Sequence, residues 1–223
     1  MSRVRERRNA SLKRQRQIRA PYDTVLIVCE GSKTEPDYFK ELKNELRLSN
    51  ANIHICGKEC GTAPESVVKY ALGELKKDPT YDRIFCVFDK DQHKSYQAAI
   101  GQIKAKKKFK VITSVPCFEF WLLLHFRDAA RPYVKAGNKS ACDNAIRDLK
   151  MYIPDYEKGS KIAFEKTYPT VSDAIKRAQL LEIRQQKAGT DNPSTKVHHL
   201  ISYLQGLGKT KKAVQKSNRK LHG

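Results

Sequence analysis

The stretch VLIVCEGSKTEPDYF, residues 25–39, decides the fold that we predict for this chain. An apolar run typical of a buried β-strand ends on a carboxylate, Glu30, and apolar residues then recur at helical spacing. A second apolar run, RIFCVFDKD at residues 83–91, ends in the same way on Asp89 and Asp91. Both stretches predict a strand with acidic side chains at its carboxyl end, followed by a helix.

The same alternation extends over the first half of the chain. We expect strands at 24–29, 51–57, 83–88 and 109–115, and helices from Thr34, over 62–77 and from about Gln92 to Lys106. Strands and helices that alternate with short links predict an α/β fold, in which a parallel sheet has helices on both faces. Ligands of such sheets bind at the carboxyl ends of the strands, which is where the acids lie.

The second half of the chain has a different pattern. We expect a buried helix in CFEFWLLLHF. After it we expect amphipathic helices with no strand between them, in the segments KSACDNAIRDLK, VSDAIKRAQLLEIRQQK and TKVHHLISYLQ. We therefore divide the chain into a basic N-terminal arm (1–20), an α/β domain (21–126), a C-terminal helical annex (127–208) and a basic C-terminal tail (209–223).

Positive charge is concentrated at the two ends of the chain. The net charge is +20, and residues 1–20 and 209–223 carry +7 and +6 of it. Such ends usually stay flexible, and nucleic acid is their natural partner because binding releases counterions from the phosphates. The alternative is that the ends only aid solubility. The side chains that we expect to contact phosphates are Arg14, Arg16, Lys211 and Lys212.

Other features indicate a cytoplasmic protein that does not enter a membrane. No run reaches 18 apolar residues, and the basic start lacks the apolar segment of a secretory signal. None of the six cysteines forms a CxxC pair, so reduced thiols are favoured over disulfides. Cys56 and Cys60 offer an alternative as zinc ligands, but no further ligand pair completes such a site.

The acids at the strand ends predict a divalent cation. Glu30, Asp89 and Asp91 have each lost part of their hydration, and each charge makes the next costlier to ionise. Carboxylate oxygens are ligands suited to Mg²⁺ or Mn²⁺, which assist phosphodiester cleavage. The alternative is that Asp89 and Asp91 only cap the next helix, and that Glu30 is a charge near the start of its own helix.

The chain resembles the Toprim domain of topoisomerases, primases and OLD-type nucleases in the order of its elements. Glu30-Gly31 follows the first strand, and Asp89-x-Asp91 follows the third, with a helix after each of the first two strands. Through VLIVCEGSKTEPDYF, CVFDKD and PCFEFWLLLHF the chain resembles the RloB-like family more closely still. The resemblance implies that Glu30, Asp89 and Asp91 bind metal. It also implies a nuclease of prokaryotic anti-phage defence, often encoded beside a partner ATPase.

One departure from the Toprim pattern leaves a ligand position to be filled. Topoisomerases usually continue as DxDxE, whereas the residue two after Asp91 is His93. Glu119 follows the fourth strand and could supply the missing acid, or it could pair with a lysine or cap its helix. Lys33 could neutralise a phosphate. The sequence leaves open whether His125, for which a core position is favoured, or His198 joins the site.

The predicted function is a metal-dependent endonuclease that needs no side-chain nucleophile, because water attacks the phosphodiester. The alternative is a nucleic-acid-binding or ATPase-partner module with a non-catalytic acidic site. The residues do not distinguish DNA from RNA or tRNA.

Overall fold

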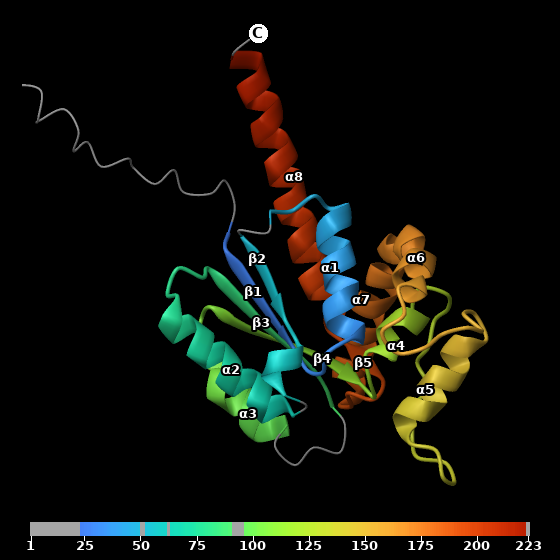
Figure 1. Cartoon of the computed structure of the whole chain (residues 1–223). Coiled ribbons are helices and arrows are strands. Elements are labelled where there is room, and N and C mark those ends of the chain that lie inside the picture. Colours follow the sequence, from blue (N-terminus) through green and yellow to red (C-terminus); the bar gives the residue numbers. More distant parts are fainter. Residues whose placement is uncertain (1–22, 50–51, 62, 91–95, 222–223) are drawn as a thin grey trace, which may run out of the picture.

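The computed structural model describes residues 23–49, 52–61, 63–90 and 96–221, with side chains up to residue 210. Its centre is a sheet of five strands in the order β2-β1-β3-β4-β5 (Figure 1). The first four strands pair in parallel and β5 pairs antiparallel to β4. They are β1 (Val25–Cys29), β2 (Ile53–Cys56), β3 (Arg83–Asp89), β4 (Phe109–Val115) and β5 (Ser194–Thr195). The predicted α/β class, a mostly parallel sheet with flanking helices, is confirmed.

Helices cover both faces of the sheet (Figure 1). They are α1 (Thr34–Glu45), α2 (Pro64–Lys77), α3 (Tyr96–Lys104), α4 (Glu119–Leu123), α5 (Ala141–Lys150), α6 (Ile162–Thr167), α7 (Val171–Ala188) and α8 (Val197–Leu221), with two short 3₁₀ helices, η2 (Lys58–Cys60) and η3 (Tyr168–Thr170). The sequence predicted all but α6, β5 and the 3₁₀ helices. These elements are too short for a periodic pattern to show.

The strands are apolar throughout because each contributes to a hydrophobic core on either side of the sheet. In β1, Val25 and Ile27 pack on one side, and Leu26 and Val28 on the other. Successive side chains of a strand point to opposite faces, so a continuous apolar run fills both cores. Helices α2 and α3 cover one core, whereas α1 and α4 to α8 cover the other.

The connections after β1 and β3 leave the sheet in opposite directions. These strands are neighbours, yet β1 continues into α1 on one face and on to β2, whereas β3 continues toward α3 on the other face and on to β4. Where two such connections diverge, a crevice opens at the carboxyl ends of the strands. Glu30 and Asp89 stand at this point of divergence.

The helices after residue 127 share one core with the sheet. Val197, Leu200, Ile201 and Leu204 of α8 are completely buried and belong to the same core as β1 and α1. The tail differs from the prediction of a flexible segment at 209–223, because α8 continues to Leu221. The buried first turns of α8 supply the helix nucleus, and adding residues to a formed helix costs little.

Candidate metal centre at the carboxyl edge of the sheet

Glu30 and Asp89 lie beside each other because β1 and β3 are adjacent parallel strands. The backbone N–H of Glu30 donates a hydrogen bond to the carbonyl of Val87 (2.8 Å), which extends the strand pairing by one residue. Oε2 of Glu30 accepts a hydrogen bond from the backbone N–H of Asp89 at 3.1 Å. The two acids, 59 positions apart in the chain, thus meet at the edge where the sequence placed them.

Gly31 allows the chain to turn immediately after Glu30. Its φ is +79°, in the left-handed region that other residues rarely adopt. Its N–H points to the carbonyl oxygen of Gly61 at 3.3 Å, so the turn is held against the loop that follows β2. A side chain at this position would strain the turn that sets the direction of Glu30.

Two further carboxylates join this edge. Burial, followed by the charges of Glu35, Glu119 and Glu30, raises the pKa of Asp89 well above its usual value. The pKa of Glu35 is raised to about 7, chiefly by burial and also by the charge of Glu119, while a backbone hydrogen bond and Lys158 act in the opposite direction. We name Glu30, Glu35, Asp89 and Glu119 the acidic cluster, because each of these charges makes the ionised form of the others less stable.

Glu119, at the start of α4, is the most buried member of the cluster. Only 2% of it is exposed. The hydroxyl of Tyr156 donates a hydrogen bond to Oε1 at 2.9 Å, and Nζ of Lys158 lies 3.6 Å from the same oxygen. Burial would lower the pKa of Lys158, but the carboxylate of Glu119 raises it above its usual value. Sγ of Cys142, on α5, donates to Oε2 at 3.9 Å.

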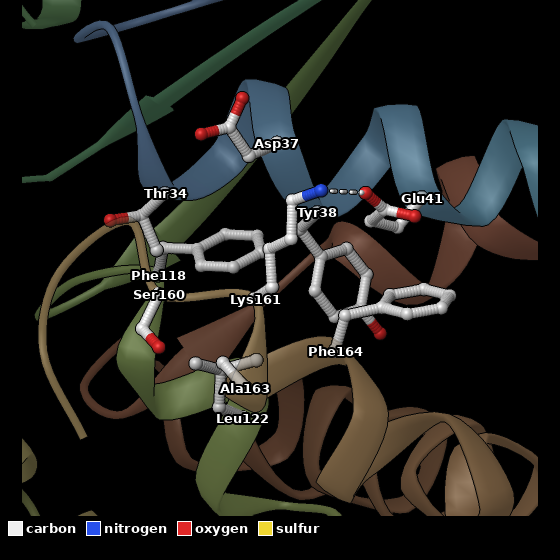
Figure 2. A pocket seen from close by; sticks show the side chains of 10 residues that line it. All are labelled: Thr34, Asp37, Tyr38, Glu41, Phe118, Leu122, Ser160, Lys161, Ala163 and Phe164. Atoms are coloured by element: carbon white, nitrogen blue, oxygen red, sulfur yellow. Dashed lines mark ion pairs between the residues drawn. The ribbon is translucent and has the colours of Figure 1, made fainter. Parts of the chain in front are cut away.

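The loop that carries Tyr156 and Lys158 also packs against α1. Gly159, with φ of +82°, lies so close that a Cβ there would be 2.7 Å from Cβ of Lys33, the residue that precedes α1. Farther along, Nζ of Lys161 lies 3.4 Å from Oε1 of Glu41 (Figure 2). The cavity in Figure 2 has a volume of only about 10 Å³, room for about one water molecule. It therefore does not hold a substrate.

Several predicted site residues fall outside the structural description. Asp91, Arg14 and Arg16 lie outside the described residues, and Lys211 and Lys212 lie on α8 where side chains are not described. Their proposed contacts with metal or phosphate remain predictions.

The two histidines that the sequence left open lie apart from the acidic cluster. His125 is 2% exposed and lies edge-on against Trp121, and its Nδ1 is 3.3 Å from the hydroxyl of Thr170. Burial lowers the pKa of His125 to about 3, so it is a neutral core residue at pH 7. His198 contacts Glu182 of α7.

Sequence reasoning missed Glu35, Tyr156 and Lys158. A signal for Glu35 existed: the helix begins soon after Glu30, so an acid in its first turn returns to the same edge of the sheet. Tyr156 and Lys158 had no such signal, because they come from an irregular loop that only the tertiary fold brings to Glu119.

The chemistry of the donor set, but not the spacing of its oxygens, suits a hard divalent cation. Its members are carboxylates that destabilise one another's charge, and a cation between them would relieve that repulsion. The oxygens of Glu30, Glu35 and Asp89 do not belong to a compact ligand group. Among the described residues, the groups of three ligand atoms within 4.8 Å of one another are Cys117–Glu119–Cys142 and Glu182–His198–His199. Cys56 and Cys60 belong to neither, and all six cysteines are free thiols.

A hollow rich in arginine lies beside α5. It has a volume of about 410 Å³, and its lining includes Arg127, Arg131, Arg147, Asp148 and Tyr133. Three guanidinium groups against one carboxylate leave it positively charged. Arg147 follows Cys142 by five residues on α5, about 140° around the helix, so the hollow lies on a different face of α5 from the thiol that contacts Glu119.

A mostly parallel sheet with carboxylates at the ends of β1 and β3 defines an α/β protein consistent with a Toprim-like fold. Comparison with family models gives a match to the RloB-like protein model over residues 25–204, and the chain therefore belongs to the RloB-like family. Searches among curated proteins and among solved structures found no match. None of the helices in the described segments is long and apolar enough to cross a membrane.

Proposed function

We propose that this protein is a metal-dependent nuclease that cleaves nucleic-acid phosphodiesters in prokaryotic anti-phage defence. The observation that carries the proposal is the acidic cluster: four carboxylates from β1, α1, β3 and α4 meet at the carboxyl edge of the sheet. Burial and the neighbouring carboxylates raise the pKa of Asp89 and of Glu35, an unfavourable arrangement that a bound divalent cation would stabilise. Such perturbed groups are typical of functional sites.

Glu30, Asp89 and Glu35 are the side chains that we expect to hold Mg²⁺ or Mn²⁺, together with Asp91. A divalent cation supplies charge stabilisation for the phosphoryl group and lowers the pKa of bound water. Glu119 occupies a different position, because Tyr156 and Lys158 already contact its Oε1. These contacts fix the position of its carboxylate.

Positive side chains on the described surface support a polyanionic substrate. The arginine hollow beside α5 offers guanidinium groups that match phosphate geometry. Lys33 is exposed at the N-terminus of α1, close to Glu35 in sequence. We propose that the hollow binds the phosphates of the strand that is cut, with Lys33 and the basic ends as further contacts.

The test is an assay with labelled RNA and DNA in Mg²⁺, Mn²⁺ or EDTA. We expect cleavage that requires metal and that disappears in the double variant Asp89→Ala, Asp91→Ala, whereas Asp173→Asn, an exposed acid of α7, retains it. Undiminished cleavage by the double variant would refute the proposed site. A substrate panel that includes tRNA would identify the nucleic acid.

The arginine hollow has its own matched pair of variants. Arg147→Gln removes one guanidinium group from the hollow, while Lys150→Gln removes an equal charge from the exposed end of the same helix. We expect only Arg147→Gln to weaken substrate binding markedly, with metal binding unchanged. Equal effects would mean that charge alone, and not this hollow, attracts the substrate.

One observation favours a second candidate function, a nucleic-acid-binding or ATPase-partner module without catalysis. Glu119 is buried and paired with Lys158, as structural acids commonly are. In that case the protein would bind nucleic acid in the same assay without cutting it in any metal.

A further inference from the structure

Three side chains where α7 meets α8 form a compact cluster that the proposed nuclease site does not use. Glu182 lies on α7, and His198 and His199 lie in the first turn of α8. One ligand atom from each lies within 4.8 Å of the other two. We name this group the His–Glu cluster.

The distances within the cluster suit a tetrahedral metal ion. Oε2 of Glu182 lies 3.2 Å from Nε2 of His198 and 2.9 Å from Nε2 of His199. Zinc binds imidazole nitrogen and carboxylate oxygen at about 2.0–2.2 Å, and tetrahedral geometry then separates two ligand atoms by roughly 3.3 Å. The cluster therefore needs only small adjustments to accept the ion.

His198 is the decisive residue, because its environment sets its tautomer. Its Nδ1 lies 3.1 Å from the carbonyl oxygen of Thr195, which can only accept a hydrogen bond, so Nδ1 carries the proton. The neutral ring then presents a lone pair at Nε2. A metal-bound histidine commonly has this arrangement, in which the other ring nitrogen donates to a carbonyl group.

The lone pair of His198 has no hydrogen-bond partner among the described atoms. The residue is completely buried, and Nε2 makes no hydrogen bond although the carboxylate of Glu182 is near. A lone pair that faces a carboxylate oxygen is unfavourable without a cation between them.

We propose that Glu182, His198 and His199 bind a zinc-type divalent cation at the corner between α7 and α8. Two imidazoles and one carboxylate favour Zn²⁺ over Mg²⁺, which prefers oxygen ligands. Three protein ligands leave a position for water. His199 also lines a hollow of about 340 Å³ with Tyr203 and Lys110, which gives the ion a path from solvent.

The site would also connect parts of the fold that are distant in sequence. Thr195 belongs to β5, and its side-chain oxygen lies 3.1 Å from that of Ser114 on β4. Metal binding would thus stabilise the corner of α7 and α8 together with the antiparallel edge of the sheet.

The experiment is a titration of the whole metal-free protein with Zn²⁺ in competition with a chromophoric chelator, and with Co²⁺ followed by its visible absorption. We expect one site per chain that Glu182→Gln or His199→Gln weakens at least tenfold. His199 is 53% exposed, so its replacement leaves the fold intact even if a change at the buried His198 does not. Zn²⁺ should also raise the melting temperature of the wild type more than that of His199→Gln.

Two controls separate this site from the other metal-binding groups. Asp89→Asn removes an acid of the proposed nuclease site, and Cys142→Ser removes a thiol of the Cys117–Glu119–Cys142 group. Both should retain the tetrahedral Co²⁺ spectrum of the His–Glu cluster. Failure of the wild type to bind Zn²⁺, or equal Zn²⁺ binding by wild type and His199→Gln, would overturn the proposal. Neither result depends on nuclease activity.

Discussion

The raised pKa of Glu35 makes a quantitative prediction about the stability of the metal-free protein. The pKa of this carboxyl group rises from its usual value of 4.5 to about 7 in the folded state. Between these two pH values the folded protein binds more protons than the unfolded chain, so the free energy of unfolding falls as the pH rises. Replacement by glutamine, which has no charge, removes this loss.

The size of the effect follows from the shift. About 2.5 pKa units at ~1.36 kcal/mol each give an upper limit of ~3.4 kcal/mol. Glu35 is partly exposed and titrates together with its neighbours, so solvent screening reduces the effect to about 1–2 kcal/mol. Between pH 4.5 and pH 8, the free energy of unfolding of Glu35→Gln minus that of the wild type should therefore increase by this amount.

The assay is urea unfolding with EDTA at several pH values, compared as wild type minus variant. The comparison is needed because His125 titrates with the opposite slope in part of this range. Glu45→Gln is the control, since Glu45 is an exposed acid of the same helix. A difference between wild type and Glu35→Gln that does not change with pH would refute the reasoning. With saturating Mg²⁺ the wild type should regain the stability that it loses at high pH.

Three further predictions concern other parts of the chain. Removal of residues 1–20 and 209–223 should reduce the slope of log binding constant against log salt concentration by roughly 0.7–0.9 for each lost phosphate contact. An unchanged slope would mean that the two ends only aid solubility. Gly159→Ala should lower the free energy of unfolding by about 1–3 kcal/mol in urea, because φ is +82° and the new methyl group would lie 2.7 Å from the Cβ of Lys33. A variant as stable as the wild type would contradict the close packing of this loop. As the pH falls from 6.5 toward 3, His125→Gln should lose less stability than the wild type, because the buried histidine stays neutral until about pH 3 whereas the unfolded chain binds the proton earlier. If urea unfolding gives parallel stability profiles for the two proteins, His125 is not buried in solution.

Periodicity revealed the elements that are long or fully buried. The four parallel strands and most of the helices were predicted because a strand buried on both faces must be apolar throughout, and an amphipathic helix must repeat its apolar positions. The two residues of β5 and the six of α6 contain less than two periods of any pattern. Their positions depend on the partners against which they pack, such as Ser114 and Val115 for β5.

The arrangement of the acids was predictable in part, for a topological reason. Parallel strands end at one edge of their sheet, so Glu30 and Asp89 could be placed together from sequence alone. Glu35 was missed because a first-turn acid usually faces solvent, although its position five residues after Glu30 already indicated the same edge of the sheet.

The sequence by itself determined the alternation of strands and helices, the acids at the strand ends and the surplus of positive charge at the two ends of the chain. Each of these is a property of residues that are close together in the chain. The tertiary structure decided which distant groups meet: Tyr156 and Lys158 at Glu119, and Glu182 at His198. Such contacts depend on the path of loops and on helix packing, and no local pattern records them, because the free energy that fixes them comes from the core as a whole.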